Sequence, residues 1–108
     1  MNPIDLSSIQ KEIASNPAVL VYFFSNRCAP CVSLRPKIKE MIDTEFPKIK
    51  LLLVDSELFP LITANFGVFA NPGILVFLEG QEFHRWSKYV SVTQIAETLK
   101  RPYNLLFD

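Results

Sequence analysis

Two residues in this chain, Cys28 and Cys31, could carry out redox chemistry. They are the only cysteines, and Ala29 and Pro30 separate them. Thiols three residues apart along a helix face the same way and lie within bonding distance of each other. Such a pair can cycle between dithiol and disulfide, supply half of a zinc site, or stay inert. Zinc usually takes four ligands, and the only histidine, His84, is expected on a distant hairpin, so redox chemistry without a metal is favoured.

The two thiols are expected to have different roles, because the motif falls where a predicted strand ends and a helix begins. A helix N-terminus offers unpaired N–H groups and a partial positive charge, and both favour thiolate over thiol. Cys28 lies at the mouth of this turn, where a partner's disulfide can reach it. Cys31 lies one turn inside the helix and is expected to be partly covered. Cys28 would therefore attack, and Cys31 would displace the product and close a Cys28–Cys31 disulfide.

Two neighbours of Cys28 act in opposite directions on the redox balance. Pro30 has no N–H, so it removes one donor that could hold the Cys28 thiolate, and this favours the disulfide form. Arg27 places a positive charge beside Cys28 and favours the thiolate, an effect that exposure to solvent weakens. We expect the balance to give a reducing couple.

The hydrophobic pattern predicts the elements that position this pair. Ala18 to Ser25 is a continuous apolar, β-branched and aromatic run, typical of a strand buried on both faces of a sheet. A long helix opens at the cysteine turn, is kinked by Pro36 and ends before Pro47. The other predictions are a short helix at 5–15, a strand at 49–54, a helix at 57–66 followed by Gly67 at its C′ position, and a hairpin at 74–78 and 82–88.

The C-terminal segment is predicted to contain a final helix and an apolar tail. Ser91 and Gln94 have the spacing of a capping box, and Pro102 is predicted to stop the helix after about Arg101. The tail from Tyr103 to Asp108 is too apolar for a solvated linker. We therefore expect it to dock, on its own domain rather than on a second copy.

These elements predict one α/β domain over residues 1–108. Two crossovers through helices would give parallel strand pairing, and the hairpin would add an antiparallel edge. The expected architecture is a three-layer α/β/α sandwich around a mixed four-stranded sheet.

Composition argues against nucleic-acid and membrane partners. Eleven Lys and Arg residues balance eleven Asp and Glu residues, and no run of one sign forms a basic patch. The longest apolar run, Ala18 to Phe24, is far below the ~20 residues of a membrane-spanning helix. The first residues lack the pattern of a secretory signal. We therefore expect a cytoplasmic protein, and we expect it to be a monomer.

A second informative stretch runs from Phe66 to Gly73, just before the third predicted strand. Proline cannot donate a hydrogen bond into a sheet, so Pro72 marks either the first residue of that strand or a turn. The residues alone leave open whether the Asn71–Pro72 peptide bond is cis or trans.

Together these residues resemble the thioredoxin family over nearly the whole chain. The resemblance rests on the cysteine motif after the first core strand, on Pro36 five residues after the second cysteine, and on the stretch 66–68 leading to Pro72 and an apolar strand. It implies a thioredoxin-like fold and a thiol–disulfide oxidoreductase that reduces protein disulfides. In that reaction Cys28 would be the nucleophile and Cys31 the resolving thiol.

The resemblance also implies how a substrate would bind. Asn71–Pro72 would be cis and would pack against the sulfurs, and the backbone of Asn71 would pair with an extended substrate segment. Arg27, Ala29 and Pro30 would complete the substrate-binding rim. The resemblance implies no cofactor and no metal, and a donor of the thioredoxin-reductase kind would regenerate the dithiol.

Several positions depart from the family pattern. Arg27 stands where the family usually has Trp, Tyr22 corresponds to its buried acid, and Asn71 replaces a bulky apolar residue. Tyr22 could donate a hydrogen bond but is a poor base near neutral pH, so water or a remote carboxylate would have to accept the proton of the resolving thiol. The alternative function is therefore a non-catalytic binding or adaptor module that holds a partner in the groove near Asn71 and Pro72.

Overall fold

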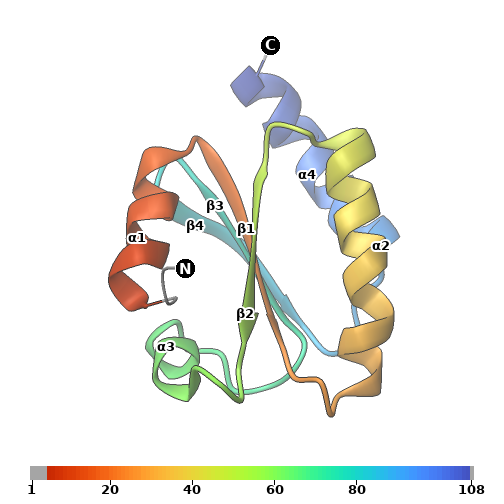
Figure 1. The fold of residues 1–108 in the computed structure, drawn as a ribbon. Helices are drawn as coiled ribbons and strands as arrows, with labels where there is room; N and C mark the ends of the chain where they lie inside the picture. Colours follow the sequence, from red (N-terminus) through yellow and green to blue (C-terminus); the bar gives the residue numbers. More distant parts are fainter. Residues whose placement is uncertain (1–4, 108) are drawn as a thin grey trace.

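The computed structural model describes residues 5–107 as three layers. In chain order the elements are α1 (Leu6–Ser15), β1 (Ala18–Phe24), α2 (Ala29–Glu45), β2 (Lys50–Asp55), α3 (Pro60–Asn65), β3 (Gly73–Leu78), β4 (Gln81–Ser87) and α4 (Val92–Phe107). The four strands form one sheet, with α1 and α3 on one face and α2 and α4 on the other (Figure 1). This confirms the predicted α/β/α sandwich. None of the helices described between residues 5 and 107 is long and apolar enough to cross a membrane.

The direction of β3 differs from the prediction. The strand order is β2-β1-β3-β4; β1 and β2 are parallel, whereas β3 is antiparallel to both β1 and β4. Only one crossover, through α2, therefore gives a parallel pair, and the prediction of two was wrong. The six residues of α3 span about 9 Å, less than a strand of about 20 Å, so this helix does not itself carry the chain back along the sheet. The strand β3 starts at the end of the sheet where β2 stops.

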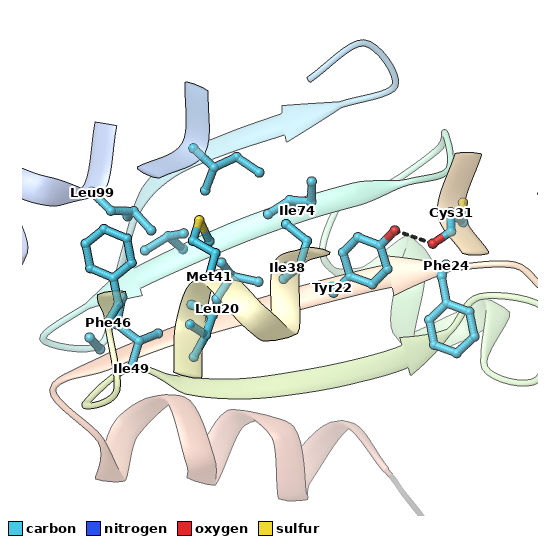
Figure 2. Packing of buried hydrophobic residues seen from close by; sticks show 14 residues of the cluster. Leu20, Tyr22, Phe24, Cys31, Ile38, Met41, Phe46, Ile49, Ile74 and Leu99 are labelled. Carbon is cyan, nitrogen blue, oxygen red and sulfur yellow. Dashed lines mark hydrogen bonds between the residues drawn. The ribbon is translucent and has the colours of Figure 1, made fainter. Parts of the chain in front are cut away.

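The strand β1 is the centre of the fold, and all seven of its residues are buried. Its side chains alternate between the two faces of the sheet. Leu20, Tyr22 and Phe24 join the core on the α2 and α4 side (Figure 2). Val19 and Phe23 join the core on the α1 and α3 side. This arrangement confirms the prediction of a strand covered on both faces, and it explains why the run contains no charged residue.

The final helix continues through Pro102 to Phe107, so the prediction that proline would end it was wrong. A proline inside a helix costs about 3 kcal/mol because it removes a hydrogen bond and crowds the preceding turn. Here the residues beyond it pack against the core, and these contacts offset that cost: Tyr103 packs edge-on against Phe46, with ring centroids 5.1 Å apart, and Phe107 packs on Tyr103. The predicted docking of residues 103–107 is thereby confirmed, and Asp108 lies outside the described residues.

The capping interactions of the helices were predicted more accurately than the helix lengths. Ser91 and Gln94 exchange the two hydrogen bonds of a capping box at the start of α4. Gly67 follows α3 with a φ of 69°, as expected for a C′ residue. The predicted helix at 57–66 is shorter, however, because the Asp55 carboxylate accepts hydrogen bonds from the N–H groups of Glu57 and Leu58 and holds them in a turn.

Replacing the docked aromatic residue of the tail should destabilise the protein. Tyr103→Ala removes the ring that covers Phe46 and the hydroxyl that accepts a hydrogen bond from the Lys48 N–H at 3.2 Å. Because Tyr103 is only partly buried, we expect the free energy of unfolding to fall by about 2 kcal/mol, less than for a fully buried aromatic. Leu105→Ala is the matched control in the same turn of α4, since Leu105 is 74% exposed and should change little. If urea denaturation gives equal losses of unfolding free energy for Tyr103→Ala and Leu105→Ala, the docking of Tyr103 is contradicted.

Candidate active site

The two cysteines lie at the junction of β1 and α2, as predicted. Cys28 is the N-cap residue of α2, and its sulfur accepts a hydrogen bond from the Cys31 N–H at 3.3 Å. The two residues form a disulfide, with Cα atoms 5.2 Å apart, a normal separation for such a bond. Cys31 is fully buried, whereas Cys28 is partly exposed. The expected difference in accessibility between the two sulfurs is therefore present.

The segment before β3 lies at the same end of the sheet as the cysteine turn. Asn71–Pro72 is a cis peptide bond, as the family resemblance implied. Gly73 pairs with Phe23 in the sheet, so Pro72 lies next to the end of β1 from which the cysteine turn starts. The carbonyl of Pro72 accepts a hydrogen bond from the Lys88 N–H at 3.2 Å, which ties the segment to the end of β4. The predicted site segments are thus brought together.

The loop after β2 connects the two halves of this site, a role that was not predicted from the sequence. Ser56 donates its N–H to the Phe24 carbonyl at 2.7 Å and its hydroxyl to the Asn71 side-chain oxygen at 3.0 Å. Glu57 accepts a hydrogen bond from the Ser25 hydroxyl, and Ser25 in turn accepts one from the Arg27 N–H. The signal was available, because parallel strands such as β1 and β2 end at the same edge of a sheet, where polar residues then meet.

Comparison with known proteins assigns the family. A thioredoxin family model matches residues 3–101. The thioredoxin-like protein YdfQ of Bacillus subtilis is 31% identical over 100 residues, which cover 93% of this chain and 88% of that protein. The chain belongs to the thioredoxin family.

Solved structures agree with this assignment. Thioredoxin from Fasciola hepatica superimposes with a TM-score of 0.75 at 27% identity over 89% of each chain. Oxidised mitochondrial thioredoxin 3 from Saccharomyces cerevisiae has a TM-score of 0.79 at 21% identity over 88% of each chain, which bears on the fold alone. The thioredoxin fold together with the Cys28–Cys31 disulfide supports a thiol–disulfide oxidoreductase.

Tyr22, which the family resemblance matched to a buried acid, lies beside the resolving cysteine of this thioredoxin-family protein. Its side chain is fully buried, and its hydroxyl donates a hydrogen bond to the Cys31 carbonyl at 2.7 Å (Figure 2). Burial raises the pKa of Tyr22 to about 12, although the positive charge of Arg35 acts against the rise. Tyr22 is therefore a protonated donor near neutral pH, as the sequence analysis expected.

The other residues of the predicted rim are exposed around Cys28. The side chain of Arg27 is 89% exposed, and its Nε lies 3.4 Å from a carboxylate oxygen of Glu57. An ion pair this exposed contributes at most about 1 kcal/mol, so Arg27 remains available to a binding partner. Ala29 and Pro30 are exposed in the first turn of α2.

A surface hollow of about 320 Å³ adjoins the cis-proline segment. It lies between the segment 67–70 and the strands β3 and β4, and Trp86 and Arg85 line its far side. Arg85 closes one end by donating hydrogen bonds to the Phe66 and Gly67 carbonyls at 3.0 and 3.1 Å. Its lining includes Ala70 and Gly73, on either side of Asn71 and Pro72, but neither cysteine.

His84, the remaining residue considered for metal binding, is separated from the cysteines. It lies exposed on β4, where its ring packs against Trp86 with centroids 4.4 Å apart, and β3 separates β4 from β1. Within the described part of the chain, no three His, Cys, Asp or Glu side chains gather in a group that could hold a metal ion.

The close approach behind the cis-proline segment requires glycine at position 73. A Cβ atom added to Gly73 would lie 2.5 Å from Val68 Cγ1 and 3.6 Å from Phe23 Cβ. We expect Gly73→Ala to lower the free energy of unfolding by about 1–3 kcal/mol through overpacking. In the double variant with Val68→Ala the clash is relieved, so the total loss should be smaller than the sum of the single losses. If the losses of unfolding free energy from Gly73→Ala and Val68→Ala add strictly in a double-mutant cycle, the contact with Val68 is not the cause of the loss.

Proposed function

We propose that this protein reduces protein disulfides through its Cys28–Cys31 pair. The observation that carries the proposal is the position of Cys28 as the partly exposed N-cap of α2. Unpaired N–H groups and the positive end of the helix dipole favour a thiolate at this position, and the thiolate is the species that attacks a disulfide.

The reaction has two exchange steps. In the first, the Cys28 thiolate attacks one sulfur of the substrate disulfide; a Cys28–substrate bond forms, and the other substrate sulfur leaves with the electron pair of the broken bond and takes up a proton from water. In the second, Cys31 attacks the Cys28 sulfur, the Cys28–Cys31 disulfide forms, and the second substrate thiol leaves. The net result is two substrate thiols and one oxidised protein.

The substrate is an extended polypeptide segment in this proposal. The backbone of Asn71, beside Pro72, would pair with it as an added strand. Arg27, Ala29 and Pro30 would contact it on the other side of Cys28, and the hollow next to the cis-proline segment would receive one of its side chains. A donor of the thioredoxin-reductase kind would restore the dithiol, which fits a protein that works in a reducing compartment such as the cytoplasm.

Replacing either cysteine by serine tests whether Cys28 attacks and Cys31 resolves. Cys28→Ser should reduce the turnover of insulin disulfides, with dithiothreitol as reductant, to the uncatalysed background, because the attacking sulfur is gone. Cys31→Ser should also lose most of its turnover and, when the reduced variant is mixed with substrate in the absence of dithiothreitol, should accumulate a mixed disulfide between Cys28 and the substrate, which mass spectrometry detects. Wild-type protein that shows no turnover would overturn the proposal and favour the non-catalytic binding module.

The charge of Arg27 should influence which disulfides react fastest. We expect Arg27→Glu to lower kcat/KM for a peptide disulfide with acidic residues beside the cysteine, and to raise it for a basic one, each by about three- to tenfold, because rim charges act mainly on association. Lys100→Glu makes the same change of charge on the exposed surface of α4 and serves as the control. Equal effects of both variants would show that Arg27 does not contact the substrate.

A further inference from the structure

Tyr22 is the only buried ionisable side chain next to the resolving cysteine within the described residues 5–107. It lies in the middle of the sheet, where its strand partners are Ile74 on β3 and Leu53 on β2, both apolar. The positive charge of Arg35 on α2 acts on it and favours the ionised form. The environment therefore fixes the hydroxyl on its single hydrogen-bond acceptor, the Cys31 carbonyl.

The helix α2 lacks one hydrogen bond just after the resolving cysteine. Pro36 has no N–H, so it cannot make the helical hydrogen bond to the Val32 carbonyl, and its ring crowds that carbonyl. The first turn keeps the bond from the Val32 N–H to the Cys28 carbonyl at 3.2 Å. The Tyr22 hydroxyl supplies a bond from the sheet to the residue directly before Val32, at 2.7 Å.

Among residues 5–107, no other buried ionisable side chain lies beside Cys31 to take its proton. The other buried polar side chains within residues 5–107 are Ser25, which is engaged by Glu57, and Thr63, which belongs to α3 on the opposite face of the sheet. The hydroxyl of Tyr22 already donates its proton to a carbonyl, and burial raises its pKa to about 12, so it cannot serve as the base near neutral pH.

We propose that Tyr22 is a positioning residue for the resolving step: its hydroxyl holds the Cys31 backbone, and with it the Cys31 sulfur, in line with Cys28, and takes no proton. The inference rests on the proposed function. In this step the Cys31–Cys28 sulfur bond forms and the bond from Cys28 to the substrate sulfur breaks. The substrate sulfur leaves with the electron pair and takes up the proton that Cys31 releases, directly or through water.

The test uses Tyr22→Phe, which removes only the hydroxyl, and the aromatic disulfide dithiobis(nitrobenzoate) as the probe. Mixed with excess probe in a stopped-flow instrument, the reduced protein releases one nitrothiobenzoate when Cys28 attacks and a second when Cys31 resolves the mixed disulfide. We expect Tyr22→Phe to slow the second, concentration-independent phase by about five- to tenfold, the effect of one lost hydrogen bond, and to leave the first phase within about twofold. An unchanged second phase would overturn the positioning role.

Two controls separate positioning from general damage. Thr63→Val also removes a buried hydroxyl that donates to a backbone carbonyl, that of Phe59 at 3.0 Å, but on the other face of the sheet, and should change neither phase. Thermal unfolding of each variant checks that it is folded. If Thr63→Val slows the second phase as much as Tyr22→Phe does, the loss reflects stability and the proposal fails.

The pH dependence of the second-phase rate tests whether a protein group accepts the proton of Cys31. It is measured in the wild type and in Tyr22→Phe. From about pH 5 to pH 9, which spans the titration of a cysteine thiol, resolution should follow a single ionisation with the same midpoint in wild type and Tyr22→Phe. A midpoint that moves in the variant, or a second ionisation in the wild type, would show that a protein group carries the proton. Failure of the first phase in the wild type would instead overturn the proposed function.

Discussion

The burial of β1 on both faces is the constraint on which the rest of this structure depends. Its seven residues lie between two apolar cores, one shared with α2 and α4 and one shared with α1 and α3. Strands β2 and β3 pair with it on either side. Because all three reach the same edge of the sheet, the cysteine turn, the loop at Ser56 and Glu57, and the cis-proline segment meet there. The site is assembled by the central strand rather than by any one loop.

This arrangement makes the two sulfurs chemically unequal. Cys28 lies outside the core, where α2 begins and solvent has access, whereas Cys31 is enclosed by the core that contains Tyr22. On the exposed side, Arg27 forms an ion pair with Glu57, and Asn71 is held by Ser56. A partner therefore meets one accessible sulfur between these polar groups and the exposed apolar residues Ala29 and Pro30, while the second sulfur is reached only from within the protein.

Local patterns predicted the parts of the fold that depend on neighbouring residues. The apolar run of β1, the helix start at Cys28 and the capping box at Ser91 follow from such patterns, and the family resemblance supplied the cis bond at Pro72. What could not be predicted depends on tertiary contacts. The continuation of α4 beyond Pro102 depends on packing against the core, about which sequence spacing carries no information. The ends of parallel strands predict that polar residues after β1 and β2 meet, but the bond from Ser25 to Glu57 depends on the register of the two strands.

The inequality of the two thiols and their ability to pair can be measured on the same protein. The fully reduced protein is treated briefly with a limiting amount of iodoacetamide, and the labelled cysteine is identified by mass spectrometry; a parallel sample is equilibrated in glutathione buffers of increasing oxidised fraction. The account predicts that Cys28 is labelled well before Cys31, and that the untreated pair converts to an intramolecular disulfide as one two-electron couple. Equal labelling of both thiols, preferential labelling of Cys31, or glutathione adducts without an internal disulfide would contradict it.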